Sequence, residues 1–230
     1  MIQLEKLTKC YGKARGVTEL TLYVPEGSCF GFIGPNGAGK STTIRTLLGL
    51  LSPTAGTAQV LGLDCVRDRE KILAQVGYMP SEAMFYPDMR VSEVIKLSAN
   101  LRKMDCRAQA DELCEALELD TRKRIRELSL GNRKKVSIVC AMQHRPRLYI
   151  LDEPTSGLDP LVQRAFWSEL EQRRREGATV FLSSHVLYEV QRHCDRAAII
   201  REGRLVVEGT TAELDIENRF FDYYEGRAGQ

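Results

Sequence analysis

The chain has 230 residues, which suffices for one large domain or for one domain that carries a smaller insert. Its 33 basic and 31 acidic residues nearly balance, so its composition argues against a nucleic-acid-binding surface, and we expect no nucleic-acid partner. The N-terminus lacks the apolar stretch of a signal peptide, and no apolar run approaches the roughly 20 residues that cross a bilayer, so we expect a cytoplasmic protein.

The first third of the chain is rich in strands. Apolar residues that alternate or run together predict five of them, at Ile2–Leu7, Glu19–Val24, Ser28–Ile33, Gly56–Val60 and Val76–Met79. Between the third and fourth strands, Ile44, Leu47 and Leu48 have helical spacing and predict a helix from Thr42 to Leu50.

The pattern changes to helices between about residues 82 and 140. Helical spacing predicts three of them, at Val91–Arg102, Ala108–Leu119 and Asn132–His144, with almost no strand signal. We therefore predict a single domain in which a helical subdomain, residues 82–140, is inserted into an α/β core made of residues 1–81 and 141–230.

Strands and helices alternate in the last third. The predicted strands are Leu148–Leu151, Thr179–Ser183, Ala197–Ile200 and Leu205–Glu208, and the predicted helices are Pro160–Arg175 and His185–His193. Such alternation indicates a mainly parallel sheet with helices on both faces. For the aromatic tail at 220–224 we expect packing on the core, with contact to a partner as the alternative.

The strongest motif is a glycine-rich loop between the strand that ends at Ile33 and the helix that follows. It matches G-x-x-x-x-G-K-[ST] and consists of Gly34, Pro35, Asn36, Gly37, Ala38, Gly39, Lys40 and Ser41, here called the phosphate loop. In such a loop, backbone N–H groups at a helix start surround the β-phosphate of a nucleoside triphosphate. Lys40 is then assigned to the β- and γ-phosphates and Ser41 to Mg²⁺. A simple glycine-rich turn is the weaker alternative, because the strand–loop–helix setting is present.

A second group of chemically active residues follows two later strands. Asp152 ends the apolar run that begins at Leu148, Glu153 comes next, and His185 follows the strand that ends at Ser183. Because ligands of parallel sheets bind beyond the carboxyl ends of the strands, we expect these residues to lie beside the phosphate loop. Asp152 is predicted to hold Mg²⁺ through water, Glu153 to polarise the attacking water, and His185 to reach the γ-phosphate.

Basic clusters and cysteines receive structural interpretations. The three basic clusters, 122–124, 133–135 and 173–175, are expected to be solvated helix faces. The seven cysteines are odd in number and form no C-x-x-C pair, which fits reduced thiols rather than a structural zinc site.

These motifs occur in the order found in one protein family. The elements are Tyr11, the phosphate loop, Leu128–Asn132, Leu148–Asp152 with Glu153, Ser156–Asp159, and His185. The chain resembles the ATP-binding cassette family of transporter nucleotide-binding subunits over essentially its whole length, and within that family it is similar to drug and antibiotic exporters of the ABC-2 type.

The resemblance implies a fold and a set of ligand contacts. The fold is a P-loop NTPase core, with a mainly parallel sheet, flanking helices and an antiparallel β subdomain, and with an inserted helical subdomain. ATP and Mg²⁺ are the implied ligands. Tyr11 would stack on adenine, and Thr42 would contact the nucleotide together with the phosphate loop. Ser129, Gly131 and Asp159 would contact ATP in a composite site.

The resemblance also implies partners. Two copies would dimerise head to tail with ATP between them, and ATP hydrolysis would then drive a separate membrane permease, with export as the expected direction. The subunit would be held at the inner face of the cell membrane by that permease. The alternatives are a soluble cassette ATPase that acts on nucleic acid or ribosomes and a regulatory cassette that does not hydrolyse ATP. A simple kinase has no use for Leu128–Asn132.

Three residues depart from the family pattern. Leu130 stands where the family has the first of two glycines, and Asn132 stands in place of its glutamine. A side chain at Leu130 would weaken ATP-dependent closure if that backbone needed a positive φ. The glutamine that usually follows the strand ending at Met79 is absent, and Ser81 is the nearest residue that would contact Mg²⁺ through water.

Overall fold

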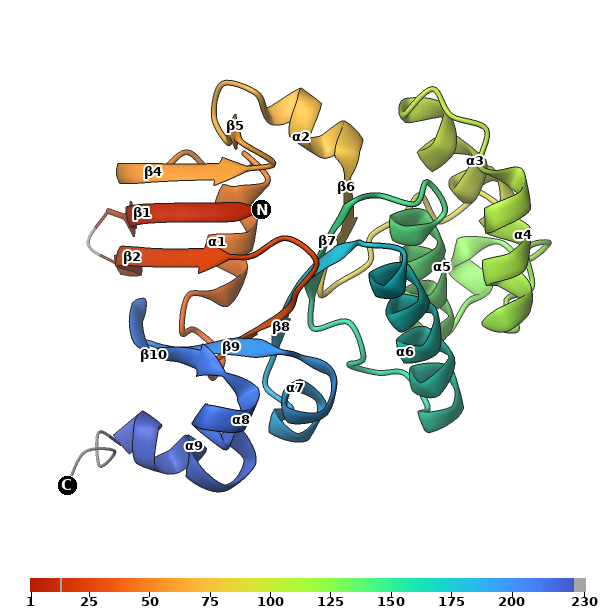
Figure 1. Ribbon diagram of the computed structural model, residues 1–230. Helices are drawn as coiled ribbons and strands as arrows, with labels where there is room; N and C mark the ends of the chain where they lie inside the picture. Colours follow the sequence, from red (N-terminus) through yellow and green to blue (C-terminus); the bar gives the residue numbers. More distant parts are fainter. Residues whose placement is uncertain (13, 226–230) are drawn as a thin grey trace.

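The computed structural model describes residues 1–12 and 14–225 and contains two sheets with helices packed around them (Figure 1). The strands are β1 Ile2–Tyr11, β2 Ala14–Val24, β3 Cys29–Ile33, β4 Ala55–Val60, β5 Leu63–Asp64, β6 Val76–Met79, β7 Leu148–Asp152, β8 Thr179–Ser184, β9 Arg196–Arg201 and β10 Arg204–Thr210. The helices are α1 Lys40–Leu47, α2 Arg69–Gln75, α3 Val91–Leu101, α4 Arg107–Ala116, α5 Leu130–Met142, α6 Pro160–Arg175, α7 Leu187–His193, α8 Thr211–Leu214 and α9 Ile216–Glu225, with a 3₁₀ helix η1 at Ile125–Glu127.

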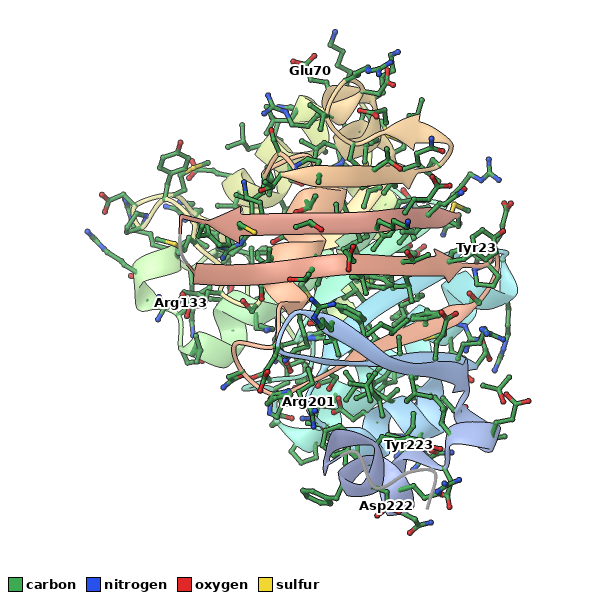
Figure 2. The ribbon with its side chains drawn as sticks, turned by 90° about the vertical axis from the view of Figure 1, so that its left-hand side faces the viewer. Tyr23, Glu70, Arg133, Arg201, Asp222 and Tyr223 are labelled. Carbon is green, nitrogen blue, oxygen red and sulfur yellow. The ribbon has the colours of Figure 1, made fainter. Side chains whose placement is uncertain are left out.

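The smaller sheet is antiparallel and has the strand order β2-β1-β4-β5. Along β1, residues that face the core, such as Ile2 and Leu4, are buried, while the residues between them are exposed. The outer face is solvated: Tyr23 of β2 is 56% exposed, and Figure 2 shows this strand at the surface. This alternation is typical of a sheet with one covered face.

The larger sheet has the order β10-β9-β3-β8-β7-β6, and all its neighbouring pairs are parallel except the edge pair β10–β9. Every residue of β3, β7 and β8 is buried, because both faces of this sheet are covered. Within β8, Val180 and Leu182 belong to one hydrophobic core and Phe181 to the other. The carboxyl ends of β3, β8 and β7 therefore meet at one edge.

Helix α1 lies between the two sheets and joins them into one core. Its Ile44 and Leu47 are fully buried in the cluster that also contains Phe30, Phe32 and Phe181 of the parallel sheet. The Phe181 ring centroid lies 5.5 Å from that of Phe32 and 6.0 Å from that of Phe30. The helix that follows the phosphate loop is thus fixed by packing from both sides.

Helices α3 to α6 gather at the side of the parallel sheet that faces away from α1 (Figure 1). Residues of α4 and α5, such as Leu113 and Val139, share one buried cluster with Phe166 of α6 and with Leu182 of β8. The predicted mixed α/β class, with a mainly parallel sheet, flanking helices and an antiparallel sheet, is confirmed.

Several expected boundaries were wrong. Helix α1 begins at Lys40 rather than Thr42, α5 begins at Leu130 rather than Asn132, and α7 begins at Leu187 rather than His185. The short elements β5, α2 and α8 gave no sequence signal; α2, for example, buries Ile72 alone. Fewer than two helical turns do not display a 3.6-residue period.

The aromatic tail forms part of α9, a helix that the local sequence pattern did not predict. Phe220 and Tyr223 pack against the hydrophobic core, as expected, while Phe221 is 66% exposed. Figure 2 shows Tyr223 at the end of the molecule opposite Glu70 of α2. Within the described part of the chain, no helix has both the length and the apolar character required to span a membrane.

Candidate active site

The phosphate loop joins β3 to α1 and is shaped to receive an anion. Gly37 and Gly39 have φ values of 81° and 109°, a left-handed backbone that favours glycine. A Cβ at Gly39 would also lie 2.7 Å from the carbonyl oxygen of Gly16. Helix α1 has no side-chain cap and no acidic residue in its first turn. Its first N–H groups are therefore open to a phosphate, with no side chain in competition.

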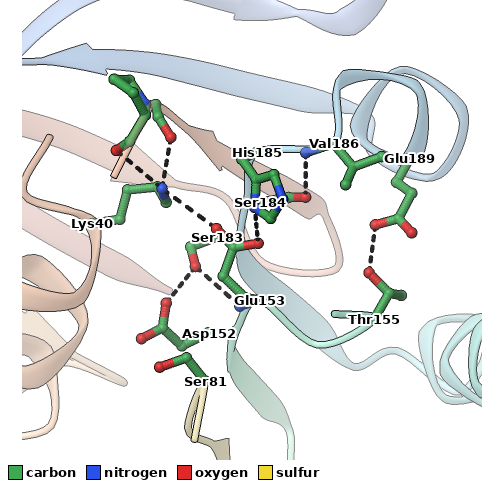
Figure 3. A network of polar contacts seen from close by, with 12 residues as sticks. Lys40, Ser81, Asp152, Glu153, Thr155, Ser183, Ser184, His185, Val186 and Glu189 are labelled. Carbon is green, nitrogen blue, oxygen red and sulfur yellow. Dashed lines mark hydrogen bonds and ion pairs between the residues drawn. The ribbon is translucent and has the colours of Figure 1, made fainter. Parts of the chain in front are cut away.

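Lys40 extends from this loop toward the end of β7. Its Nζ donates hydrogen bonds to the carbonyl oxygens of Gly34 (2.6 Å) and Pro35 (3.3 Å), and it lies 3.4 Å from Oε1 of Glu153 (Figure 3). The last contact is an ion pair without hydrogen-bond geometry, since the buried Oε1 accepts no hydrogen bond. This oxygen has lone pairs available for a water molecule.

The carboxylate of Glu153 is held between Lys40 and His185. Nδ1 of His185 lies 2.7 Å from the other oxygen, Oε2 (Figure 3). Ser183 of the neighbouring strand donates to Oδ1 of Asp152 (2.5 Å) and accepts from the backbone N–H of Glu153 (3.2 Å). Because β7 and β8 are adjacent and in register, residues 31 or 32 positions apart in the chain meet here.

The predicted metal ligands include one acidic side chain, Asp152, which is 2% exposed. Figure 3 shows Ser81 close to it, and Ser41 lies half-buried in the first turn of α1. Across residues 1–12 and 14–225, no group of three or more His, Cys, Asp and Glu side chains forms a metal site. One carboxylate with hydroxyl and water ligands fits Mg²⁺, which usually keeps several waters beside substrate phosphates.

The segment Leu128–Asn132 leads into α5. Ser129 is the N-cap, and its Oγ accepts a hydrogen bond from the N–H of Asn132 at 3.3 Å. Gly131 packs closely on the loop between β7 and α6, since a Cβ at Gly131 would lie 3.1 Å from the carbonyl oxygen of Gly157. Leu130 has helical φ and is 64% exposed. The concern that its side chain strains the backbone is therefore unfounded.

Asp159 and Tyr11, two further residues predicted to contact the nucleotide, are positioned by different elements. Asp159 caps α6, since its Oδ1 accepts hydrogen bonds from two backbone N–H groups of that helix. Tyr11 ends β1 and is 44% exposed. A Cβ at Gly16 would lie 2.9 Å from the Tyr11 ring and 3.2 Å from Cγ2 of Thr42. The tyrosine ring and the first turn of α1 thus border the same glycine.

Several buried basic residues were missed by sequence reasoning, and one of them lies at this edge. The expectation of solvated basic faces was wrong for Lys134, Lys135 and Arg173, which are 3%, 9% and 3% exposed. Nζ of Lys134 instead donates to the carbonyl oxygen of Glu153 (2.7 Å). Helical spacing could have predicted the burial of Lys134, because this residue lies four residues before the buried Ile138 and so on the same face of the helix.

A buried hydrogen bond next to the site was also missed. Thr155 donates to Oε2 of Glu189 at 2.7 Å and so joins the loop after Glu153 to α7 (Figure 3). Burial raises the pKa of Glu189, while the hydrogen bond from Thr155 opposes that rise. No local pattern in the sequence pairs two residues 34 positions apart.

Comparison with known proteins assigns this arrangement to a family. A family profile described as "ABC transporter" matches residues 17–156, which include the phosphate loop, Asp152 and Glu153. The chain belongs to the ABC transporter family. The predicted class of enzyme, an ATPase of the ATP-binding cassette type, follows from that membership, and the resemblance noted from the motifs is confirmed.

Relatives of this cassette extend the comparison. It is 34% identical to the "Probable multidrug ABC transporter ATP-binding protein YbhF" of Escherichia coli (strain K12) over 95% of this chain, but it spans only 38% of that protein. It is 36% identical to the "Nod factor export ATP-binding protein I" of Paraburkholderia xenovorans, over 93% of this chain and 72% of the relative. A solved structure described as the ATP binding subunit of an ABC transporter superposes with a TM-score of 0.88 at 30% identity, covering 96% of this chain and 93% of the other.

Proposed function

We propose that this cassette binds ATP with Mg²⁺ at the phosphate loop and hydrolyses it to drive a separate membrane permease. The observation that carries the proposal is the position of the Glu153 carboxylate between Lys40 and His185. A carboxylate with an unused buried oxygen, next to a lysine of a phosphate loop, is suited to accept a proton from an attacking water.

In this proposal each residue has a defined task. Lys40 exchanges its contacts with two loop carbonyls for the phosphate oxygens of ATP, whose charge it neutralises. Glu153 takes the proton of the attacking water, and His185 orients its carboxylate. Asp152 and Ser41 would hold Mg²⁺, with Ser81 nearby through water; the ion would neutralise charge on the phosphates. Tyr11 would provide a stacking surface for adenine.

A second copy would complete the ATP site. The N-terminus of α5, with Ser129 and Gly131, favours an anionic partner, and residues 82–140 act in this proposal as the helical subdomain that presents it. Leu130 and Leu161 are 64% and 79% exposed, and they lie in the first turns of α5 and α6, beside the close contact between the start of α5 and the loop before α6. Asp159 would approach the nucleotide from the loop before α6. We therefore infer a homodimer with ATP between the copies.

Export through a membrane permease is supported by the names of the relatives and by one surface. Those relatives are described as multidrug-transporter and Nod-factor-export proteins. A cavity of about 470 Å³ between α3 and the segment before it is lined mainly by apolar side chains, among them Met84, Tyr86 and Leu101, which are 88%, 71% and 76% exposed. We assign this surface to an apolar cytoplasmic segment of the permease, which would hold the cassette at the inner face of the membrane.

The proposal is tested with the Glu153→Gln variant, which removes the base but preserves the shape of the side chain. We expect ATP binding to persist, phosphate release to stop, and an ATP-dependent dimer to accumulate in size-exclusion chromatography. Glu115→Gln, an exposed position on α4, is the matched control. A Glu153→Gln variant that stays monomeric with saturating ATP would contradict the composite site.

The permease is tested separately. Wild-type cassette reconstituted with the polytopic membrane protein encoded beside its gene should show ATP hydrolysis stimulated by that protein. Met84→Asp should remove the stimulation but leave the basal rate unchanged, because Met84 lies away from the phosphate loop and is exposed. Stimulation by RNA or ribosomes, with none by the membrane protein, would favour the soluble alternative.

A further inference from the structure

Lys134 brings a second ammonium group to the carboxyl edge of the parallel sheet. It lies in α5 and is 3% exposed, and its Nζ donates to the carbonyl oxygens of Ser81 (3.0 Å) and Glu153 (2.7 Å). Burial lowers its pKa, while the charges of Asp152 and Glu153 oppose that shift. Burying an ammonium group costs free energy that a neutral side chain would avoid. A local function of this charge and its hydrogen bonds would account for its presence.

The main chain of Glu153 is held from both sides. Its φ is 52°, a left-handed conformation that is strained for a residue with a side chain. Its N–H donates to the carbonyl and hydroxyl oxygens of Ser183, both at 3.2 Å, and its carbonyl oxygen accepts from Lys134. The carboxylate carried by this segment contacts Lys40 and His185. Lys134 is therefore one of two anchors for the base.

The same helix connects this anchor to its own N-terminus. Ser129 caps α5 and Gly131 lies in its first turn, so Lys134 follows the cap by five residues. At 1.5 Å per residue this is about 7.5 Å along the helix axis. A helix segment of this length, hydrogen-bonded throughout, moves as one body, so displacement of its N-terminus also displaces Lys134.

We infer that Lys134 is a positioning residue that couples the two ATP sites of the dimer. The N-terminus of α5 engages the ATP held by the second copy, and Lys134 transmits that engagement to the carbonyl of Glu153 in its own chain. Glu153 acts on the other ATP of the pair. The inference rests on the proposed function, in which two copies hold two ATP molecules.

A simpler role for Lys134 is to neutralise the carboxylates of Asp152 and Glu153. The two roles differ in what they predict. Neutralisation alone would change the rate of ATP hydrolysis at each site and leave the cooperativity between the two sites unchanged. Coupling predicts that removal of the Lys134 ammonium group also removes this cooperativity, which is measured as a Hill coefficient.

The test measures ATP hydrolysis against ATP concentration for Lys134→Met, Lys134→Arg and the control Lys96→Met, which alters an exposed lysine of α3. Wild type and control should show a Hill coefficient above 1. Lys134→Met should lower kcat about tenfold or more, leave KM within about twofold, and reduce the Hill coefficient to about 1. Lys134→Arg should retain the kcat and the Hill coefficient of the wild type, because a guanidinium also donates to carbonyl oxygens.

Two results would overturn the inference: a Hill coefficient of 1 in the wild type, or an unchanged coefficient in Lys134→Met. If Lys134→Met does not fold, Lys134→Ala replaces it, since its side chain donates no hydrogen bond either, and the same outcomes apply. Glu153→Gln in the same assay separates the two proposals. Normal turnover by that variant refutes the proposed base, whereas its inactivity together with an unchanged coefficient in Lys134→Met refutes the coupling alone.

Discussion

His144 makes the stability of this protein depend on pH through one buried side chain. It follows α5, is 7% exposed, and its Nε2 lies 3.3 Å from the carbonyl oxygen of Val76, while Nδ1 has no hydrogen-bond partner. Burial, helped by the charge of Arg102 and opposed by the hydrogen bond to Val76, lowers the pKa of His144 to about 4. The folded protein therefore holds this imidazole neutral at physiological pH.

The sign and size of the effect follow from proton linkage. In the unfolded chain His144 has its ordinary pKa of 6.5, so between about pH 4 and 6.5 the unfolded state binds the proton and the folded state does not. The contribution to stability is complete above pH 6.5 and is lost as the pH falls toward 4. At pH 5.5, one unit below the pKa of the unfolded chain, the protonated form of His144 exceeds the neutral form about tenfold in the unfolded state. This excess lowers the free energy of unfolding by about 1.4 kcal/mol.

The assay compares wild type with His144→Gln, whose amide does not titrate and still donates to a carbonyl oxygen. Urea unfolding is followed by the fluorescence of Trp167, the single tryptophan, near pH 7.5 and pH 5.5. Between these two values the wild type should lose about 1.4 kcal/mol more of its free energy of unfolding than the variant does. Carboxylates titrate equally in both proteins. Equal losses in the two proteins would refute the buried neutral imidazole.

The remaining predictions concern the site and the sheet beneath it. Lys40→Ala should weaken ATP binding about 10-fold or more and abolish turnover, because charge-assisted hydrogen bonds to phosphate are lost; normal hydrolysis, with Lys96→Ala as the control, would refute the phosphate role. Tyr11→Ala should weaken ATP binding about 5- to 100-fold by calorimetry through lost stacking on adenine, and equal affinities for ATP and GTP in the wild type would argue against base recognition. Gly31→Ala should lower the free energy of unfolding by about 1–3 kcal/mol, because its Cβ would lie 2.3 Å from Cγ1 of Val190; an unchanged urea midpoint would show that α7 moves aside.

The local sequence predicted what depends on near neighbours. The phosphate loop, the apolar strand before it and the carboxylates at the end of β7 are each contained in a segment of about ten residues. Glycine at 37 and 39 is explained by backbone geometry alone. Alternation of strands and helices then placed Asp152, Glu153 and His185 at one edge of a parallel sheet, since such strands end on the same side.

The sequence by itself thus determined the family, the α/β class and the residues that carry the chemistry, because those features are written in short motifs and in their order. The tertiary structure decided which partners each side chain meets: Lys40 faces Glu153 across 113 positions of chain, and Lys134, on a basic run expected to be solvated, is buried against the same residue. Burial and long-range contact arise from the packing of helices and sheets, which a local pattern does not specify, and they set the electrostatics of the site.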